Sequence, residues 1–253
     1  VTLNGNAWLR AQVLSIVGGQ SSVGNAAIYA QIVTGAPVTP DPLASLPAPV
    51  LSAHATSLNS GGTAASPATR KYTGNTQITI NPGIYWGGIS VSANAIVRMN
   101  PGIYIMAGGG ISVSGNGKVE GENVFIYNTN DPHNPSGDGA HAPISITGNG
   151  YTALAAPSAD YCAATGNPYK GILIFNDRAS TTNVEVHGNG GNNGDPPYAG
   201  YIYNKNGDVV LTGNGAYGRM GAIARRMTVS GNGTFSALDP SRTPDTKTVR
   251  LVE

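Results

Sequence analysis

The sequence predicts an all-β fold, a right-handed parallel β-helix (β-solenoid) of about nine coils with loop insertions. Glycine accounts for 36 of the 253 residues, roughly twice its usual share, which argues against a helical protein. The apolar residues form short alternating runs of Ile, Val and Tyr, which is the period of a β-strand. A third observation, a phrase that recurs along the whole chain, indicates stacked repeats.

The recurring phrase reads apolar, any residue, apolar, small polar, Gly, Asn. Four of the eight spacings between successive anchor asparagines fall between 18 and 22 residues, so the unit is about 19 residues long, with loops added in some copies. The phrase Asn-Pro-Gly-Ile-Tyr also repeats, at residues 81–85 and 100–104. The anchor asparagines of the phrase are Asn6, Asn25, Asn75, Asn94, Asn116, Asn149, Asn189, Asn214 and Asn232.

Each unit is expected to form one coil of the solenoid. A second apolar phrase, at residues 171–175, 200–203 and 221–224, precedes the last three anchors, so a unit holds at least two short strands. Asn tolerates the left-handed backbone of a sharp corner, and Gly tolerates it better. An Asn at the same corner of every coil would hydrogen-bond to the coils above and below. We therefore predict that the anchor asparagines form a structural corner ladder.

An antiparallel meander is the competing fold, because Asn-Gly after an alternating run is also a β-hairpin signal. Whole units of the same length repeat, including the phrase Pro-Gly-Ile-Tyr, and a series of hairpins does not require units of constant length and sequence. The solenoid is therefore favoured.

The domain organisation predicted is a single solenoid, 1–253, with surface insertions near 26–70, 128–143 and 150–170 and a C-terminal arm at 239–253. Solenoids normally protect their terminal coils. Here the repeat begins at Val1, so we expect either a piece of a longer chain or a first coil covered by the last coil of another copy. Repeated head-to-tail contact of that kind gives a filament, a homopolymer. The arm would cap its own rod or pair with a neighbour.

Composition limits the partners. With 14 Lys+Arg against 13 Asp+Glu, the net charge of +1 suggests neither a nucleic-acid partner nor attraction to an anionic membrane. No apolar stretch approaches the roughly 18 residues that span a bilayer, so no membrane insertion of this segment is expected. The single cysteine excludes an internal disulfide. Because the chain starts at Val1 rather than Met, it is interpreted as a processed or excised segment.

We expect no catalytic residues. Glycoside cleavage needs paired carboxylates, and the acidic residues do not recur at equivalent positions of neighbouring coils. Glu185 stands alone within its strand phrase. The most suggestive pair is Asp177 and Arg178, which is either a strand-end turn with a local ion pair or a functional pair; adjacent strand residues point to opposite faces.

We also expect no metal and no cofactor. A loop carries Asp131, His133, Asp138 and His141, but their spacing matches no ligand motif, and solvated turns collect such residues. Cys162 has no nucleophile pattern around it.

Other chemistry-bearing residues have structural interpretations. His187 occupies the small-polar slot of the repeat, which indicates a surface or corner position. The glycine-rich phrases at 108–110 and 188–194 are followed by no helical period, so they are not phosphate loops. The tyrosines of the strand phrases form either stacked ladders or a sugar-binding face. They include Tyr85, Tyr104, Tyr127, Tyr201 and Tyr203.

Three segments carry a resemblance to a known family. They are Asp-Pro-Leu-Ala-Ser-Leu-Pro at 41–47, the Pro-Gly-Ile-Tyr units with their Gly-Gly-Ile-Ser-Val-Ser continuations at 87–92 and 109–114, and residues 171–178 followed by 184–190. The chain resembles the Gly/Asn-rich region of bacterial TadG-like proteins, which are associated with Tad or Flp pilus assembly. The resemblance implies an exported protein with a role at the cell surface, and it supplies no catalytic residues.

The expected function is that of a non-catalytic extracellular structural or adhesive protein, a rigid module of the bacterial cell surface or of pilus-associated material. Its expected partner is a second copy, with surface glycans or pilus components as further candidates. The alternative is a polysaccharide-binding or polysaccharide-degrading β-helix protein.

Overall fold

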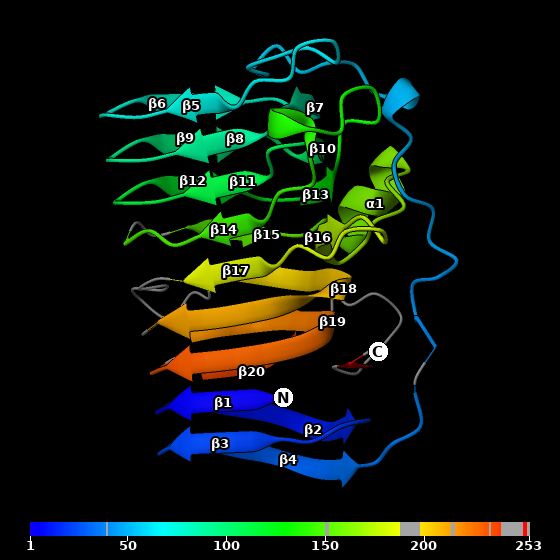
Figure 1. Cartoon of the computed structure of the whole chain (residues 1–253), viewed down its shortest axis with the longest axis vertical. Coiled ribbons are helices and arrows are strands. Elements are labelled where there is room, and N and C mark those ends of the chain that lie inside the picture. The colour runs from blue at the N-terminus through cyan, green and yellow to red at the C-terminus, as the bar shows by residue number, and fades with distance from the viewer. Residues whose placement is uncertain are drawn as a thin grey trace.

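The computed structural model is a parallel β-solenoid of about ten turns (Figure 1). It describes residues 1–38, 40–149, 152–187, 198–213, 216–232, 234–238 and 250–251. Each turn contains up to three strands, and all pairings between the named strands of these residues are parallel. The predicted fold class is confirmed, and the antiparallel meander is excluded.

Equivalent strands of successive turns stack as three sheets. The first sheet contains β5 (Arg70–Tyr72), β8 (Ile89–Val91), β11 (Ile111–Val113), β14 (Ile144–Ile146), β17 (Val184–His187), β1 (Thr2–Gly5) and β3 (Ser21–Gly24). The second contains β6 (Gln77–Ile80), β9 (Ile96–Met99), β12 (Lys118–Gly121), β15 (Ala153–Ala155) and β20 (Thr234–Leu238). The third contains β7 (Gly83–Trp86), β10 (Gly102–Ala107), β13 (Val124–Thr129), β16 (Ile172–Asn176) and β21 (Arg250–Leu251).

Four longer strands pass from one sheet to the next. They are β2 (Trp8–Ile16), β4 (Ala27–Thr34), β18 (Tyr198–Gly213) and β19 (Ala216–Gly231). The helical elements are α1 (Ala159–Thr165) and two 3-10 turns, η1 (Leu51–Ala53) and η2 (Gly137–Gly139).

The strand phrase explains the register of the first sheet. Ile89, Ile111 and Ile144 lie directly above one another, and all three are buried inside the coil. The serine that follows each of them faces outward. This alternation fixes the register because a slip by one residue would turn every apolar side chain toward solvent.

Glycine corners allow neighbouring turns to approach closely. Gly109 has a φ of +67°, and a Cβ at that position would lie 1.9 Å from the carbonyl oxygen of Gly87 in the adjacent turn. Only a residue without a side chain fits there.

The order of stacking differs from the order of the chain. β1 lies between β19 and β3, so the first coil stacks on the last described coil of the same chain (Figure 1). The expectation that another copy covers the first coil is therefore wrong for this structure. Residues 1–34, here called the N-terminal coils, form the bottom of the rod in Figure 1.

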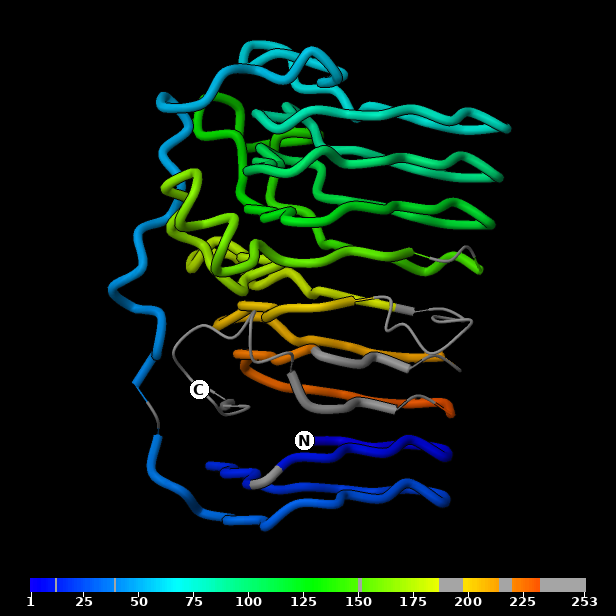
Figure 2. Tube along the Cα trace, turned by 180° about the vertical axis from the view of Figure 1, so that it is seen from behind, coloured from blue at the N-terminus to red at the C-terminus, as the bar shows by residue number. Residues whose placement is uncertain are grey.

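A linker, residues 35–38 and 40–50, connects the N-terminal coils to the opposite end of the rod. It runs along the flank for nearly the whole height of the stack (Figure 2). The predicted insertion at 26–70 is wrong at its start, because residues 27–34 are strand β4. Apolar residues alternate in this segment and pack on β2, and the prolines that suggested a loop begin only at Pro37.

The other predicted insertions contain regular structure as well. Residues 128–143 include the end of β13 and η2, and 150–170 include β15 and α1. Of the arm at 239–253, the structure describes Arg250 and Leu251, which pair with β19 and, through Arg250, with β2 of the same rod. The rest of the arm lies outside the described residues.

The described residues form two apolar clusters. One fills the interior of the coils, where Tyr85 and Tyr104 stack with ring centroids 5.9 Å apart. The second lies on the outer face of the third sheet, where Phe175 and Tyr203 stack at 4.3 Å. Leu43 of the linker packs into this outer cluster. The linker therefore covers apolar surface that would otherwise face solvent.

Candidate functional site

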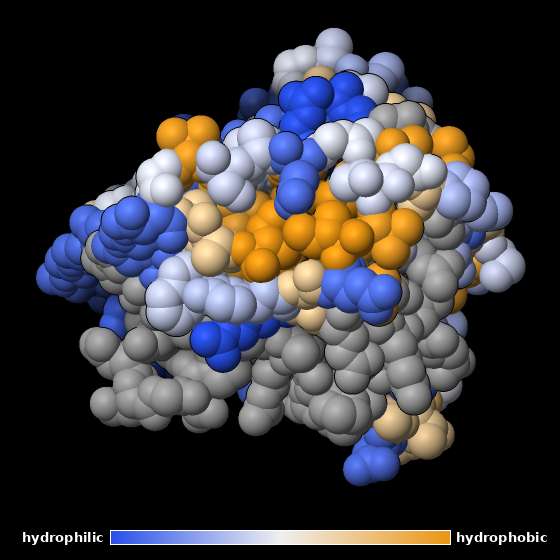
Figure 3. All heavy atoms as spheres, turned by 90° about the horizontal axis from the view of Figure 1, so that it is seen from below, coloured by the Kyte–Doolittle hydropathy of each residue, from blue (hydrophilic) through white to orange (hydrophobic). Residues whose placement is uncertain are grey.

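The bottom turn of the rod, residues 21–34, is called the open coil. β3 pairs with β1 alone and β4 with β2 alone among the described residues, so the outer edges of both strands are unpaired. All four residues of β3 are exposed. Seen from below, this end of the molecule presents an apolar area at its centre (Figure 3).

Apolar side chains of the open coil point in both directions. Ala26, Ile28, Ala30 and Ile32 face the interior and pack on the coil above, but they are only partly buried. On the outer surface Val23 is 63% exposed, and Tyr29 and Val33 are also exposed. No charged residue occurs from position 11 to position 40. The charges and prolines that usually protect a sheet edge from pairing are thus missing from β3 and β4.

The opposite end of the rod is capped. Segment 55–57 adds to the edge of β7 through a parallel bridge between Thr56 and Ile84. The side chain of Asn59 then accepts a hydrogen bond of 3.0 Å from the backbone N–H of Asn81, and the backbone carbonyl oxygen of Asn59 accepts one from the hydroxyl of Tyr72. Residues 55–69, here called the cap, thus cover the third-sheet edge at this end, while β5 and β6 pair on one side alone among the described residues.

The corner asparagines form hydrogen bonds that all have the same polarity. Asn25 donates to Asn6 at 3.2 Å, and Asn6 donates to Asn232 at 2.6 Å. Toward the cap, Asn116 donates to Asn94 at 3.0 Å and Asn94 to Asn75 at 3.1 Å. Each Nδ2 therefore points toward the cap.

Because each of these corner asparagines donates toward the cap, Oδ1 of Asn25 at the open coil accepts no hydrogen bond from the described residues. Asn149 lies at its corner with its backbone N–H bonded to the carbonyl oxygen of Gly115. Asn189 and Asn214 lie outside the described residues.

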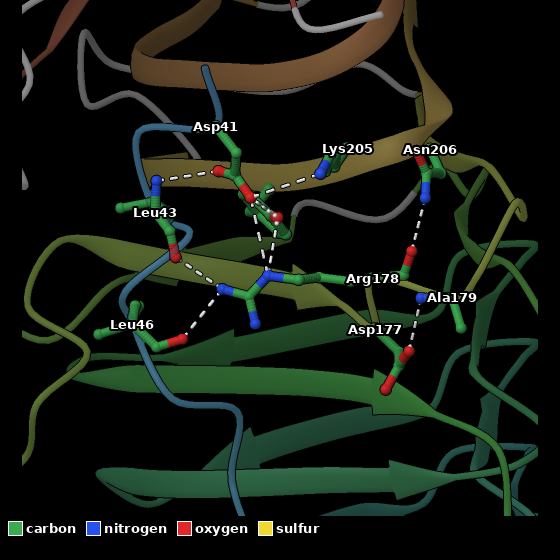
Figure 4. Close-up of polar contacts among 9 residues, drawn as sticks. Asp41, Leu43, Leu46, Asp177, Arg178, Ala179, Lys205 and Asn206 are labelled. Carbon is green, nitrogen blue, oxygen red and sulfur yellow. Dashed lines mark hydrogen bonds and ion pairs between the residues drawn. The ribbon is translucent and has the colours of Figure 1, made fainter.

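The linker is fixed to the rod by a cluster of contacts around Asp41 (Figure 4). The hydroxyl of Tyr203 donates a hydrogen bond of 2.6 Å to Asp41 Oδ2, and the backbone N–H of Leu43 donates one of 2.9 Å to Oδ1. The guanidinium of Arg178 donates to the carbonyl oxygens of Leu43 and Leu46, at 2.6 and 2.9 Å. We call this cluster the latch.

Charge and burial reinforce the latch. The Asp41 side chain is 5% exposed, and Nε of Arg178 lies 3.7 Å from its Oδ2. Burial raises the pKa of Tyr203, and its hydrogen bond to Asp41 raises it further. The phenol therefore stays neutral and remains a donor. Arg178 also lies over the Phe175 ring, with its guanidinium carbon 5.1 Å from the centroid.

The predicted local ion pair between Asp177 and Arg178 is wrong. Asp177 accepts hydrogen bonds from the Thr129 and Tyr127 hydroxyls and from the N–H of Ala179. Arg178 instead contacts a carboxylate in the distant linker. Asp177 and Arg178 follow β16 directly. Their side chains extend to different sides of this turn and therefore have different partners.

The loop with metal-type side chains forms structural contacts. Asp131 is fully buried and accepts a hydrogen bond from the N–H of His133, and Asp138 accepts one from the N–H of Thr69. Nε2 of His141 is buried without a partner. Within the described part of the chain, no group of three or more His, Cys, Asp or Glu residues is placed to hold a metal ion.

The remaining candidate residues lie as follows. Glu185 is on β17, paired through its backbone with Ser145 and Val210. His187 ends β17, and its side chain lies outside the described set, as does the phrase 188–194. Cys162 is on α1, where burial raises the pKa of its thiol.

The five tyrosines named from the sequence are all buried, so none offers an exposed ring to a sugar. They are Tyr85, Tyr104, Tyr127, Tyr201 and Tyr203. Stacking is observed between Tyr85 and Tyr104 and between Tyr203 and Phe175, while Tyr127 lies tilted against Phe175.

A second, buried asparagine ladder is present that was not expected from the sequence. Asn128 donates to Asn176 at 2.8 Å, and Asn176 donates to Asn204 at 2.9 Å; all three residues are fully buried and lie in β13, β16 and β18. The signal was present, because Ile-aromatic-Asn recurs at 126–128, 174–176 and 202–204.

A comparison with protein-family models, with curated proteins and with solved structures finds no match to this chain. In the described residues no helix has the length and apolarity needed to cross a bilayer.

Proposed function

We propose that this chain is a non-catalytic structural protein, a rigid β-solenoid module of the bacterial cell surface or of pilus-associated material, which associates end-on with further copies of itself. The observation that carries this proposal is the open coil. At one end of the rod the cap covers the third-sheet edge and the edge strand β5 carries Arg70 and Lys71, whereas the other end presents an unpaired and uncharged edge with exposed apolar side chains.

A second copy is the partner that fits this edge best. Strands β5 and β6 of a second copy, whose outer edges are unpaired among the described residues, can extend the parallel sheets through the same backbone hydrogen bonds and cover the partly buried Ile28 and Ile32. The free acceptor on Asn25 also matches the donor that each corner asparagine directs toward the next turn. An exposed edge without protecting charges is a surface on which such pairing occurs.

Several aspartates have structural roles, which favours a non-catalytic protein. Asp41 holds the linker, Asp177 contacts Tyr127, and Asp208 accepts hydrogen bonds of 3.0 and 2.9 Å from Arg225. The exported location rests on the resemblance described above.

Polysaccharide binding is the second candidate, favoured by an exposed aromatic group on the outer wall. Trp8 and Tyr29 meet edge to face with ring centroids 6.0 Å apart, and the guanidinium of Arg10 lies 5.6 and 5.3 Å from these two rings. Exposed Trp and Tyr rings are suited to stacking against sugars. Binding of soluble glycans that is lost in Trp8→Ala would support this function.

The structural proposal is tested by light scattering and electron microscopy over a concentration series. We expect the unmodified chain to form end-on oligomers or filaments. Ile28→Lys places a charge on the inner side of the open coil and should abolish association. The matched control is Ser112→Lys, on the exposed side of β11 in the middle of the rod, which should associate normally.

Circular dichroism of both variants checks that the fold is retained. A chain that stays monomeric at all concentrations, or oligomers that are equally abundant in Ile28→Lys and Ser112→Lys, would overturn the proposal.

A further inference from the structure

We infer that the joint between β1 and β19 also forms between two copies of the chain, by exchange of the N-terminal coils, and that the latch holds these coils on their own chain. The inference rests on the end-on association proposed above: the order of coils in the stacked rod is the same, but the contact between two copies lies at the joint, and the open coil meets the cap of its own chain. Its partner is a second copy of this chain.

The joint is built from the contacts that connect consecutive coils. Residues 2–5 align with residues 228–231, and the backbone N–H of Asn6 donates to the carbonyl oxygen of Gly231 at 2.8 Å. The side chain of Asn6 donates to that of Asn232, 226 residues away in sequence. The opposite edge of β1 pairs with β3 in the same register pattern. The β19 edge of a second copy is identical, so β1 of either chain can form these contacts.

The linker alone determines whether the N-terminal coils pack on their own chain or on a second copy. Its 16 positions reach about 53–58 Å when fully extended, at roughly 3.3–3.6 Å per residue. Ten turns spaced by about 4.8 Å give a stack of roughly 43 Å. The linker therefore spans the rod with little slack, and it favours its own chain by raising the effective concentration of the coils. Exchange of an identical element between copies is a low-cost route to association.

Exchange also covers the open coil. In the closed chain the first two coils follow the last coil in the stack. When a second copy supplies the N-terminal coils at the joint, the open coil of that copy lies next to the cap of the same copy in the stack. Chain order and stacking order then agree, as expected for consecutive elements. The second half of β4 and segment 55–57 both belong to the third sheet, so they lie in the same column.

The latch opposes this exchange. In the exchanged rod the linker passes directly from the open coil to the neighbouring cap, and residues 41–46 reach the latch at the level of β16 and β18 only if residues 35–41 are almost fully extended. Release of the latch exposes Leu43 and separates Asp41 from Arg178. Weakening the latch should therefore shift the population toward exchanged assemblies.

Cysteine pairing in the full-length chain tests the joint. Asn4 and Ser230 face each other across it, and neither side chain is fully buried. Asn4→Cys and Ser230→Cys are placed on separate chains in a Cys162→Ser background, co-expressed with different tags and oxidised. We expect a disulfide-linked heterodimer in the oligomeric fraction, several-fold more abundant when both chains also carry Arg178→Met.

The matched control uses Ser90→Cys and Ser112→Cys on separate chains. These residues face each other between β8 and β11, where exchange of residues 1–34 brings no second chain. No heterodimer is expected from this pair, and an equal yield from both pairs would indicate aggregation and overturn the inference.

The two proposals fail differently. Oligomers in which Asn4→Cys and Ser230→Cys form a disulfide only when both are on the same chain would overturn exchange and leave end-on association standing. The absence of oligomers in every background would overturn both.

Discussion

Arg178 donates a hydrogen bond of 2.6 Å to the carbonyl oxygen of Leu43, a residue 135 positions earlier in the chain. This contact fixes the linker to the rod beside the end of β16 (Figure 4). Because the linker connects the N-terminal coils covalently to the rest of the solenoid, this side chain adds to the β1–β19 pairing that holds the two coils on the rod.

Arg178→Met should lower the free energy of unfolding by about 2–4 kcal/mol, because it removes two charge-assisted hydrogen bonds and leaves the buried Asp41 without its main cation. It should also make the linker more sensitive to limited proteolysis. Arg98→Met is the matched control, since the Arg98–Glu120 pair is exposed and should contribute at most about 1 kcal/mol. Urea denaturation of the two variants measures the difference; equal losses would contradict a specific role for the latch.

The two asparagine ladders should differ in strength. Asn176→Ala leaves the buried Oδ1 of Asn204 without its donor and should cost about 2–4 kcal/mol. Asn94→Ala removes two exposed hydrogen bonds, for which water substitutes, and should cost about 1 kcal/mol or less. Chemical denaturation compares them directly. A larger loss for Asn94→Ala would show that the corner ladder, not the buried one, is the stronger support.

Gly109→Ala and Gly74→Ala separate backbone strain from lack of space. Both glycines have positive φ, +67° and +69°, so each substitution carries a strain of about 1–2 kcal/mol. A Cβ at position 109 also meets the backbone of Gly87 at 1.9 Å, whereas at position 74 it meets nothing within 4 Å. We expect Gly109→Ala to disrupt the fold and Gly74→Ala only to lower the melting temperature by a few degrees. Similar melting curves would refute this distinction.

The stability of the protein should decrease above pH 10. Burial raises the pKa of Tyr104 above its ordinary value of 10.0, and the same cause acts on Tyr85. In the unfolded chain these phenols ionise near pH 10, while in the folded chain they stay protonated. The unfolded state therefore binds fewer protons above pH 10, and the free energy of unfolding falls as the pH rises.

Tyr104→Phe removes one of these groups. The variant should lose about 1 kcal/mol at neutral pH, because its hydroxyl donates to the carbonyl oxygens of Asn100 and Ile80. Above pH 10 its stability should fall less steeply, by up to about 1.4 kcal/mol per pH unit. Melting curves at pH 9, 10 and 11 test this, with the exposed Tyr29→Phe as control. Parallel pH profiles for Tyr104→Phe and the unmodified chain would disprove the assignment.

The local rules of the repeat were sufficient to predict the coil. Alternation in phrases such as Ile-Ser-Val-Ser indicated which side chains face inward, and Gly and Asn marked the corners. The buried ladder of Asn128, Asn176 and Asn204 was missed although its phrase also repeats, because an Asn at the end of an apolar run is equally typical of an exposed turn. Strand β4 was assigned to a loop because the neighbouring prolines outweighed a weak alternation of Ala and Ile.

The sequence by itself determined the repeat, the parallel stacking and the position of the corners, because these depend on residues within one unit of about 19. Only the tertiary structure decided that β1 stacks on β19, since any coil edge of this kind accepts any other and the sequence does not specify which edges meet. It also decided that Arg178 pairs with Asp41 rather than with Asp177. That choice depends on the path of a linker whose two ends lie at opposite ends of the rod.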